Sequence, residues 1–383
     1  MLNTIKPLFQ LDPDITFLNH GSFGACPTAI FNELVQWQKK LENEPVRFIT
    51  NDLYPALDVS RKALGEFVGC DGNDLVFFPN PSTAINTVAK SLVLNPGDEI
   101  LSTDHEYGAM NRTWKFICQK TSANFIPVEI PIPVSSHEEF VDRFWSRVTE
   151  RTRVIFISHL TSQTALIFPV EEICKRARKA GIFTIVDGAH APGHIPLDIS
   201  SFDPDIYIGA CHKWMCTPKG VSFLYARKSV QDLIDPLVVS WGWESDDPGK
   251  SRFLDYHQWQ GTRDMSAFLT VPFAIQYLKE LNWQTLTKKS HQMVVDFQNE
   301  ICQMLNTPII CANPHMWQGQ MCSFLLPGSP DPVKIQSQLM DNHNIEIPVF
   351  SWKDRVILRV SVQPYNSEAD LQKLKDILPS CLN

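Results

Sequence analysis

The chain has 383 residues, of which 44% are hydrophobic and 20% are charged, and its formal net charge is −8. These are ordinary values for a globular protein whose core is large enough to need neither disulfides nor a structural metal. Lysines and arginines form no basic run, so nucleic acid is not an expected partner. Because no apolar run reaches membrane-spanning length and the ten cysteines include no C-x-x-C pair, we expect a soluble cytoplasmic protein with reduced thiols.

In the first two thirds of the chain, short apolar runs alternate with amphipathic stretches. The strand-like runs are Glu99 to Ser102, Asn124 to Val128, Val154 to His159, Ile182 to Asp187, Ile206 to Gly209 and Val221 to Ala226. Between them lie helix-like stretches such as Val170 to Ala180, where Ile173 and Ala177 fall on one face. The alternation predicts an α/β fold with a mostly parallel sheet covered by helices on both faces.

The pattern changes from about Phe268 onward. Helices are predicted at Phe268 to Leu281, Leu286 to Leu305 and Val333 to Asp341, and strands at Met321 to Leu326 and Val356 to Val362. We therefore expect a large α/β domain over residues 19–260 and a smaller α+β C-terminal domain over 261–383. An N-terminal arm, residues 1–18, is expected to pack on the smaller domain.

The first candidate functional segment is Asn80-Pro81-Ser82-Thr83-Ala84, which opens a helix-like stretch reaching Leu92. A Pro-Ser-Thr start presents free backbone N–H groups, two hydroxyls and the positive end of the helix dipole. These groups suit a phosphate. Plain helix capping explains Ser82 or Thr83 equally well.

The second segment is Val186-Asp187-Gly188-Ala189-His190. Asp187 closes an apolar strand, and ligand sites of α/β proteins form at the carboxyl ends of parallel strands. A carboxylate there can keep a pyridinium nitrogen protonated, although a turn or helix-cap aspartate has the same appearance. A metal pair formed by His190 and His194 is not expected, because Pro192 breaks the helix that such spacing requires.

The third segment is Gly209-Ala210-Cys211-His212-Lys213-Trp214, which lies between two predicted strands. A lysine held between buried strands is partly desolvated, which lowers the pKa of its amine and makes it a nucleophile toward an aldehyde. A solvated loop lysine is the alternative.

The order of these segments resembles the class V aminotransferase family of fold-type I enzymes that use pyridoxal 5'-phosphate (PLP), and within it the isopenicillin N epimerase-like proteins. Cysteine desulfurases and C–S lyases are related to the same family. The matching segments are Leu18-Asn19-His20-Gly21-Ser22-Phe23-Gly24, Asp104-His105-Glu106-Tyr107-Gly108, Ser158-His159, Asp187-Gly188-Ala189-His190, His212-Lys213-Trp214, Gly261-Thr262-Arg263-Asp264 and Leu358-Arg359-Val360-Ser361. The resemblance covers nearly the whole chain and implies a large domain with a mostly parallel seven-stranded sheet.

The resemblance also implies the roles of the central residues. Lys213 matches the lysine that is joined to the aldehyde of PLP and moves the proton at Cα. Asp187 matches the partner of the pyridine nitrogen, and His190 matches the position that hydrogen-bonds the ring hydroxyl. Either His105 or Tyr107 would stack on the ring, and either could act as an acid or base.

Phosphate contacts are implied for Ser82, Thr83 and His212. Many relatives have a phosphate-binding serine three residues before the lysine, where this chain has Ala210, so Thr262 is expected to carry more of the phosphate binding. Because the corresponding Gly-Thr loop of the family reaches the neighbouring subunit, the resemblance implies a homodimer with shared active sites.

Substrate contacts are implied at four positions. Arg359 matches the arginine that holds the α-carboxylate of an amino-acid substrate by a bidentate pair. Asn19 and Arg47 lie in segments typical of the epimerase-like group, and Arg47 could bind a second carboxylate. His159 could face the substrate near the ring, with packing at the strand end as the alternative.

Three reactions stay open: epimerisation or racemisation, β-elimination by a C–S lyase, and transamination. We expect the first, with His105, Tyr107 or water serving the face opposite Lys213. Persulfide-forming desulfuration is not expected, because the segment from His343 to Arg359 contains no cysteine. A nucleotide-binding loop at Gly249-Lys250-Ser251 is not expected, because the earlier glycine of that motif is missing. A non-catalytic binding protein is not expected either, because it would be expected to have lost Lys213 or Asp187.

Overall fold

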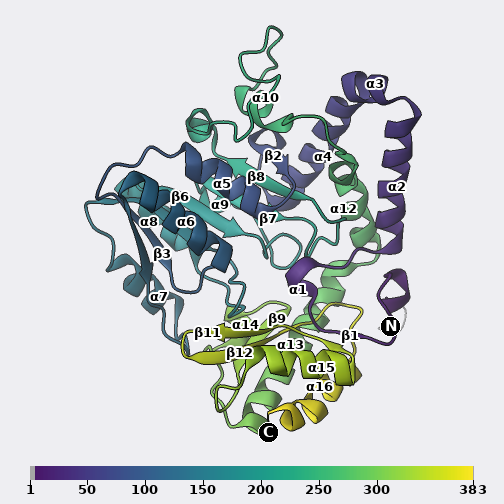
Figure 1. Ribbon diagram of the computed structural model, residues 1–383, viewed down its shortest axis with the longest axis vertical. Coiled ribbons are helices and arrows are strands. Elements are labelled where there is room, and N and C mark those ends of the chain that lie inside the picture. Colours follow the sequence, from purple (N-terminus) through teal and green to yellow (C-terminus); the bar gives the residue numbers. More distant parts are fainter. Residues whose placement is uncertain (1–4, 383) are drawn as a thin grey trace.

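The computed structural model describes residues 5–382 and has a large α/β body and a smaller α+β body (Figure 1). The large body is built on a seven-stranded sheet in the order β2-β8-β7-β6-β5-β3-β4. Its strands are β2 (Leu75–Phe78), β3 (Glu99–Thr103), β4 (Asn124–Val128), β5 (Thr152–Ser158), β6 (Phe183–Gly188), β7 (Ile206–Ala210) and β8 (Ser222–Ala226). Only β8 is antiparallel to its neighbours, so the carboxyl ends of the other six strands lie at one edge.

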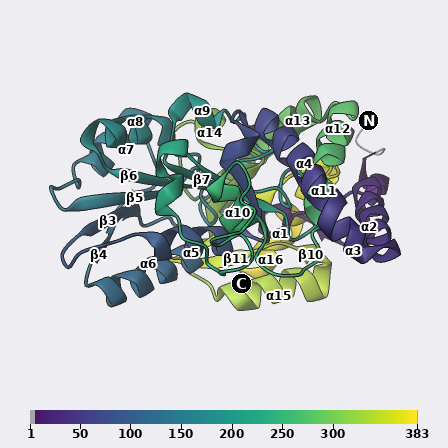
Figure 2. The ribbon, with the colours of Figure 1, turned by 90° about the horizontal axis from the view of Figure 1, so that it is seen from above.

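Helices cover both faces of this sheet, as Figure 2 shows from above. Alternate side chains of β5 enter different cores: Val154 and Phe156 pack on one face, Ile155 and Ile157 on the other. The first core is closed by α5 (Pro81–Ser91), α6 (Gly108–Thr121) and α10 (Arg252–Gln258). The second is closed by α4 (Leu53–Val68), α7 (His137–Trp145), α8 (Val170–Ala180) and α9 (Ile199–Phe202). Burial on both faces explains why these strands read as continuous apolar runs.

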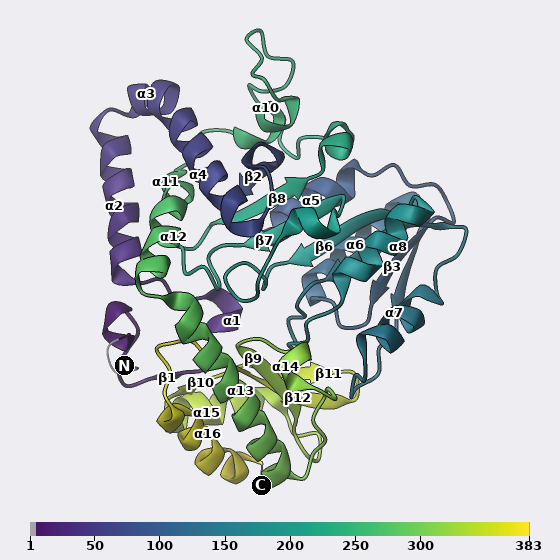
Figure 3. The same ribbon diagram turned by 180° about the vertical axis from the view of Figure 1, so that it is seen from behind.

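The smaller body has an antiparallel sheet in the order β11-β12-β9, made of β9 (Met321–Leu325), β11 (Val349–Trp352) and β12 (Arg355–Ser361). Its core is completed by α13 (Trp283–Leu305), α15 (Pro332–His343) and α16 (Glu368–Cys381), which Figure 3 shows from behind. The N-terminal segment joins it through β1 (Thr16–Phe17), which pairs in parallel with β10 (Ile345–Glu346). Leu18 lies in this core, whereas residues 1–4 of the expected arm are outside the described residues.

The first helix after residue 261 still packs on the large body. The predicted helix Phe268 to Leu281 is divided at Thr270 into α11 (Ser266–Leu269) and α12 (Val271–Glu280), with a proline in the first turn of the second helix. Phe268 stacks on Phe77 with 5.0 Å between ring centroids, so α11 packs on the large body. The domain limits themselves stay a prediction.

The α/β fold with its seven-stranded, mostly parallel sheet is confirmed. β2 was not predicted, because its four buried residues form so short an apolar run that it has no diagnostic period. The helices α2 (Thr28–Asn43), α1 (His20–Phe23), α3 (Pro45–Arg47) and α14 (Pro314–Trp317) were not predicted either. Within residues 5–382, every helix is too short or too polar to cross a membrane.

Candidate active site

Three of the segments singled out in the sequence meet at the carboxyl edge of the large sheet. Asp187 is the residue before the last of β6, Lys213 follows the end of β7, and α5 begins directly beyond β2. Because these strands run in the same direction, their loops open on one side of the sheet. This is the edge at which ligands bind in open α/β sheets.

Lys213 lies on a tight turn between β7 and β8. The backbone N–H groups of Cys211 and His212 both donate to the carbonyl of Val221, at 3.0 and 3.2 Å. Gly24 packs against this turn with φ +70°, and a Cβ there would lie 2.9 Å from the Cα of Lys213. Burial, and then the positive charge of Arg359, lower the pKa of the Lys213 amine from 10.5 to about 7. A substantial fraction of this amine is therefore neutral and nucleophilic near neutral pH.

Asp187 is 5% exposed, and burial raises the pKa of its carboxyl group, while the Ala189 N–H and the positive charge of Lys213 oppose that shift. The Ala189 N–H, 3.0 Å from Oδ1, is its one hydrogen-bond donor among residues 5–382. A buried carboxylate with one donor is incompletely satisfied. A cationic N–H, such as that of a pyridinium ring, would supply the missing partner.

His190 bridges the lysine and the following tryptophan. Its Nε2 lies 3.1 Å from the Nζ of Lys213, and its Nδ1 lies 3.3 Å from the Nε1 of Trp214. Burial, and then the positive charge of Lys213, hold the pKa of His190 well below 6.5. The ring is therefore neutral at neutral pH.

The predicted phosphate-binding residues differ in whether their polar side-chain atoms already have hydrogen-bond partners. The Asn80 side chain caps α5, accepting from the Thr83 N–H at 2.8 Å and the Thr83 hydroxyl at 3.0 Å. The Ser82 hydroxyl has no partner within the described part of the chain, so it is free to bind a ligand. His212 directs Nδ1 to the Val221 carbonyl at 2.8 Å. Thr262 is exposed in the loop beyond α10, and its side chain has no hydrogen bond within residues 5–382.

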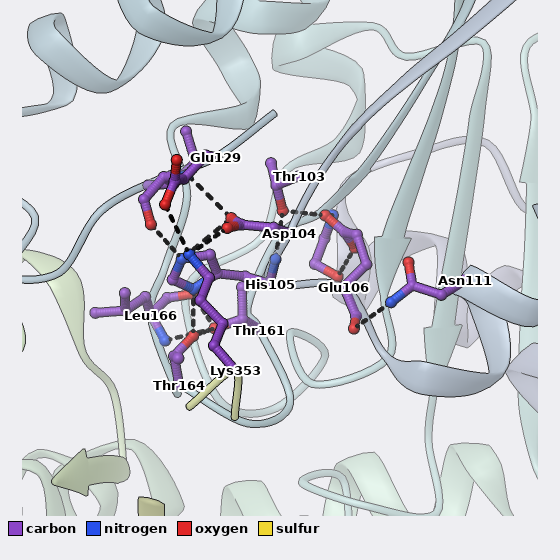
Figure 4. A network of polar contacts seen from close by, with 12 residues as sticks. Thr103, Asp104, His105, Glu106, Asn111, Glu129, Thr161, Thr164, Leu166 and Lys353 are labelled. Atoms are coloured by element: carbon purple, nitrogen blue, oxygen red, sulfur yellow. Dashed lines mark hydrogen bonds and ion pairs between the residues drawn. The ribbon is translucent and has the colours of Figure 1, made fainter. Parts of the chain in front are cut away.

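The two candidates for the ring-stacking position are clearly separated by their surroundings. His105 is fully buried, with Nδ1 2.8 Å from the Thr164 hydroxyl and Nε2 2.8 Å from the Ile130 carbonyl. Trp352 and Phe168 meet its ring edge-on, and Figure 4 shows it inside a closed polar network. A ring that covers a cofactor must have an open face, which His105 lacks. Tyr107 is 49% exposed at the start of α6, so the structure favours it over His105.

Arg359 lies in β12 of the smaller body and is 1% exposed. Nη2 donates to the Ser22 hydroxyl at 3.0 Å and Nη1 to the Ser162 carbonyl at 2.5 Å, while Nε has no partner. Among residues 5–382 no carboxylate forms an ion pair with it. A buried guanidinium without a counter-ion is strongly unfavourable, so this arrangement suits an incoming anion.

Asn19 reaches Arg359 through Ser22. The Ser22 hydroxyl donates to Asn19 Oδ1 at 2.5 Å, and Asn19 Nδ2 donates to the Glu346 carboxylate at 3.0 Å. Asn19 follows β1 closely, and the parallel partner of β1 is β10, which carries Glu346. Ser22 and Glu346 were missed in the sequence, although Ser22 lies in a segment that matched the family.

The other predicted substrate residues are not equally placed. His159 is at the edge, with its N–H 2.8 Å from the Asp187 carbonyl and Nδ1 2.9 Å from the Tyr207 hydroxyl. Burial lowers the pKa of His159 to about 4. Arg47 is exposed at the end of α3, 3.8 Å from Glu44. In Figure 1, α3 lies at the top of the molecule, far from the smaller body that carries Arg359.

Glu106 is a buried acid that the sequence analysis overlooked. Its Oε1 accepts from the Thr103 hydroxyl at 2.7 Å and from the Ser158 N–H at 3.2 Å. Burial, with a smaller effect of the Asp187 charge, raises the pKa of Glu106 to about 7. No sequence spacing pointed to it, because β3 and β5 become neighbours only in the fold.

These features fit PLP. The amine of Lys213 suits the aldehyde, and the Asp187 carboxylate, which has a single hydrogen-bond donor, suits the pyridine nitrogen. The free Ser82 hydroxyl suits the phosphate. No cluster of histidine, cysteine and acidic side chains within residues 5–382 could hold a metal ion.

Comparisons with known proteins agree with this chemistry. The family model for aminotransferase class-V matches residues 29–374. Isopenicillin N epimerase of Amycolatopsis lactamdurans is 32% identical over 96% of both chains. A probable chloroplastic L-cysteine desulfhydrase of Arabidopsis thaliana is 28% identical over 96% of this chain and 83% of its own. The fold of a cysteine desulfurase from Thermococcus onnurineus NA1 superposes with a TM-score of 0.84 at 18% identity, covering 99% of this chain and 98% of that one.

The match of the family model extends over most of the chain, and the relatives share nearly its full length. Lys213 and Asp187 lie at one edge of its large sheet, and the buried Arg359 of the smaller body is near enough for its charge to act on the Lys213 amine. The chain belongs to the class V aminotransferase family of PLP-dependent enzymes.

Proposed function

We propose that this enzyme removes and returns the proton at Cα of an amino acid, as an epimerase-type enzyme. The observation that carries the proposal is Arg359, a buried guanidinium with a free Nε and no carboxylate partner among the described residues. An α-carboxylate would supply the missing counter-ion through a two-point contact. That contact would hold the amino acid by a group that all α-amino acids share.

Lys213 is the proposed base. With a pKa lowered to about 7, its amine can accept a proton near neutral pH, which an ordinary lysine cannot. PLP supplies the electron sink that makes the Cα proton acidic. Asp187 is proposed to keep the ring nitrogen protonated, because burial favours a charged partner for its carboxylate.

Epimerisation also requires a proton donor on the opposite face. Tyr107 is the proposed donor, because it is half exposed at the edge where β3 ends, whereas His105 is enclosed. The similarity to isopenicillin N epimerases at 32% and 30% identity, over almost the full chain, supports the epimerase-type reaction.

A C–S lyase is the second candidate, and one observation favours it. The pKa of Lys213 is lowered to about 7, which suits a base, and β-elimination needs only a single base at Cα. Several relatives at 26% to 28% identity are described as L-cysteine desulfhydrases. Persulfide-forming desulfuration is disfavoured, because Cys322 is fully buried and burial holds the pKa of its thiol well above the ordinary value.

A panel of L-amino acids in deuterated water separates these reactions. We expect deuterium at Cα together with loss of optical rotation. Pyruvate and sulfide from cysteine or cystine would instead establish the lyase, and keto acid formed only with a second keto acid would establish a transaminase. Either of those products without racemisation would overturn the epimerase proposal.

Tyr107→Phe tests the second face. If Tyr107 returns the proton, the variant should still exchange the Cα proton for deuterium but should lose racemisation by at least about tenfold. Equal losses of exchange and racemisation would mean that Tyr107 acts before the proton is removed, as a ring contact.

We further propose a homodimer in the cytoplasm. Thr262 is exposed and reaches no residue of its own site, and Trp241, 86% exposed, lies in the segment before α10. Both would be covered if the loop of one subunit entered the site of the other. Sedimentation should give twice the mass of 43.6 kDa, and a monomer would refute the shared site.

A further inference from the structure

The two ring nitrogens of His190 have partners of different kinds. The Trp214 indole N–H, which can donate but not accept, lies 3.3 Å from Nδ1. Nδ1 must therefore accept, which requires it to be unprotonated. Since the ring is neutral, its proton must be on Nε2, the nitrogen 3.1 Å from the Nζ of Lys213.

The proton on Nε2 has a consequence for the lysine. An N–H directed at Nζ is a favourable contact only when the amine has a lone pair, so it stabilises the neutral amine and disfavours the ammonium form. The opposite tautomer would present a lone pair to Lys213 and would stabilise the ammonium ion. The choice of tautomer thus affects the amine directly.

We propose that Trp214 is a positioning residue that fixes His190 in the Nε2–H tautomer and so keeps a hydrogen-bond donor directed at the amine of Lys213. The inference does not depend on which reaction at Cα the enzyme performs. It concerns the state of the lysine amine before it binds PLP.

The surroundings of Trp214 leave the indole little freedom. Trp214 is fully buried and stacks on His194, with 3.7 Å between ring centroids. Gly193, with φ +78°, packs so closely that a Cβ there would lie 2.8 Å from the Trp214 backbone. The indole N–H therefore stays directed at His190.

The neighbouring histidines have assigned tautomers as well. His194 donates from Nδ1 to the His190 carbonyl at 3.0 Å, because its Nε2 accepts from the Gln320 N–H. His20 donates from Nε2 to the Lys213 carbonyl at 3.0 Å, because its Nδ1 accepts from the Tyr365 hydroxyl at 2.9 Å. Burial lowers the pKa of both His20 and His194 to about 3. Neither ring competes for the proton on His190.

The charged and titratable groups near His190 are Lys213, Arg359, His194 and His20. The first two are positive when protonated, so they disfavour a second proton on the ring. Asp187 acts on the Lys213 amine in the opposite direction. These groups remain in a variant that lacks only the indole N–H.

The first test is the tautomer itself, measured by ¹⁵N NMR on the full-length protein with labelled histidine. The wild-type spectrum should show His190 with its proton on Nε2. A proton on Nδ1 would overturn the proposal without any variant.

The second test is Trp214→Phe, which removes the N–H and keeps a ring. The pH midpoint for covalent capture of added PLP by the cofactor-free full chain should rise by about one unit, and the single His190 tautomer should be lost. Trp114→Phe is the matched control, since Trp114 is also fully buried but its Nε1 has no partner. An unchanged midpoint and tautomer in Trp214→Phe would contradict the proposal, as would an equal shift in Trp114→Phe.

Discussion

Two histidines of this enzyme follow parallel strands of the same sheet yet have opposite roles. His105 lies beyond β3 and His190 beyond β6, and both are buried. Both nitrogens of His105 are satisfied by groups that do no chemistry, the Ile130 carbonyl and the Thr164 hydroxyl. His190 instead directs one nitrogen at the Lys213 amine. A position at the sheet edge therefore does not make a histidine functional. What distinguishes His190 is that one of its ring nitrogens faces the Lys213 amine.

The polar network around His105 joins the two bodies of the protein. Lys353, which follows β11, lies 2.6 Å from the Asp104 carboxylate and 3.3 Å from that of Glu129 (Figure 4). Trp352 packs edge-on against the His105 ring. This region holds the smaller body, and with it Arg359, in place over the large sheet.

The contrast depends on Lys213, the partner of His190, and the largest effect is expected there. Lys213→Ala should abolish covalent attachment of PLP and lower turnover by at least about 10³-fold, because both the nucleophile and the proposed base are removed. Absorption of the bound cofactor and turnover measure it. Lys228→Ala, at an exposed lysine, is the control. A cofactor still covalently bound in Lys213→Ala would refute the assignment.

The next largest effect is expected at Arg359. Arg359→Lys should lower kcat/KM by about 10²-fold, chiefly through KM, because an ammonium group cannot form the two-point contact with a carboxylate. Arg355→Lys, at an exposed arginine of the same strand, should change neither constant. If kcat fell and KM stayed constant, Arg359 would not be the carboxylate site.

The pH dependence of cofactor capture sharpens the account of Lys213. The neutral amine is the reactive form, so the capture rate should rise about tenfold per pH unit below about pH 7 and level off above it. The rate of absorbance change on adding PLP to the cofactor-free protein gives this profile. A rate still rising toward pH 10.5, the ordinary lysine pKa, would show that burial does not tune the amine.

The smallest effects are expected from replacing each histidine in turn, and these replacements distinguish the roles of His105 and His190 directly. His105→Phe leaves the Ile130 carbonyl and the Thr164 hydroxyl without their partner, so it should lower the free energy of unfolding by about 2 kcal/mol and leave the capture midpoint unchanged. His190→Phe should raise that midpoint, because the amine loses its donor. Denaturant unfolding and the capture profile measure both quantities. The contrast fails if the midpoint moves only in His105→Phe.

Much of this fold follows from local sequence patterns. The strands β4 and β6 and the helix α8 were predicted within a residue or two, because apolar runs and a 3.6-residue period are local signals. Lys213 and Asp187 were found from their places at strand ends, and Arg359 through a segment that resembles the family. Neither signal could distinguish His105 from Tyr107, because the difference is the packing of Trp352 from another part of the chain. Glu106 and Glu346 became visible only once their hydrogen-bond partners were brought close by the fold.

The central claim is that the amine of Lys213 carries the cofactor. Treating the protein with PLP and borohydride fixes that bond, and peptide mass mapping then locates it. The account predicts one modified peptide, containing Lys213. Modification of a different lysine, with Lys213 left free, would contradict it.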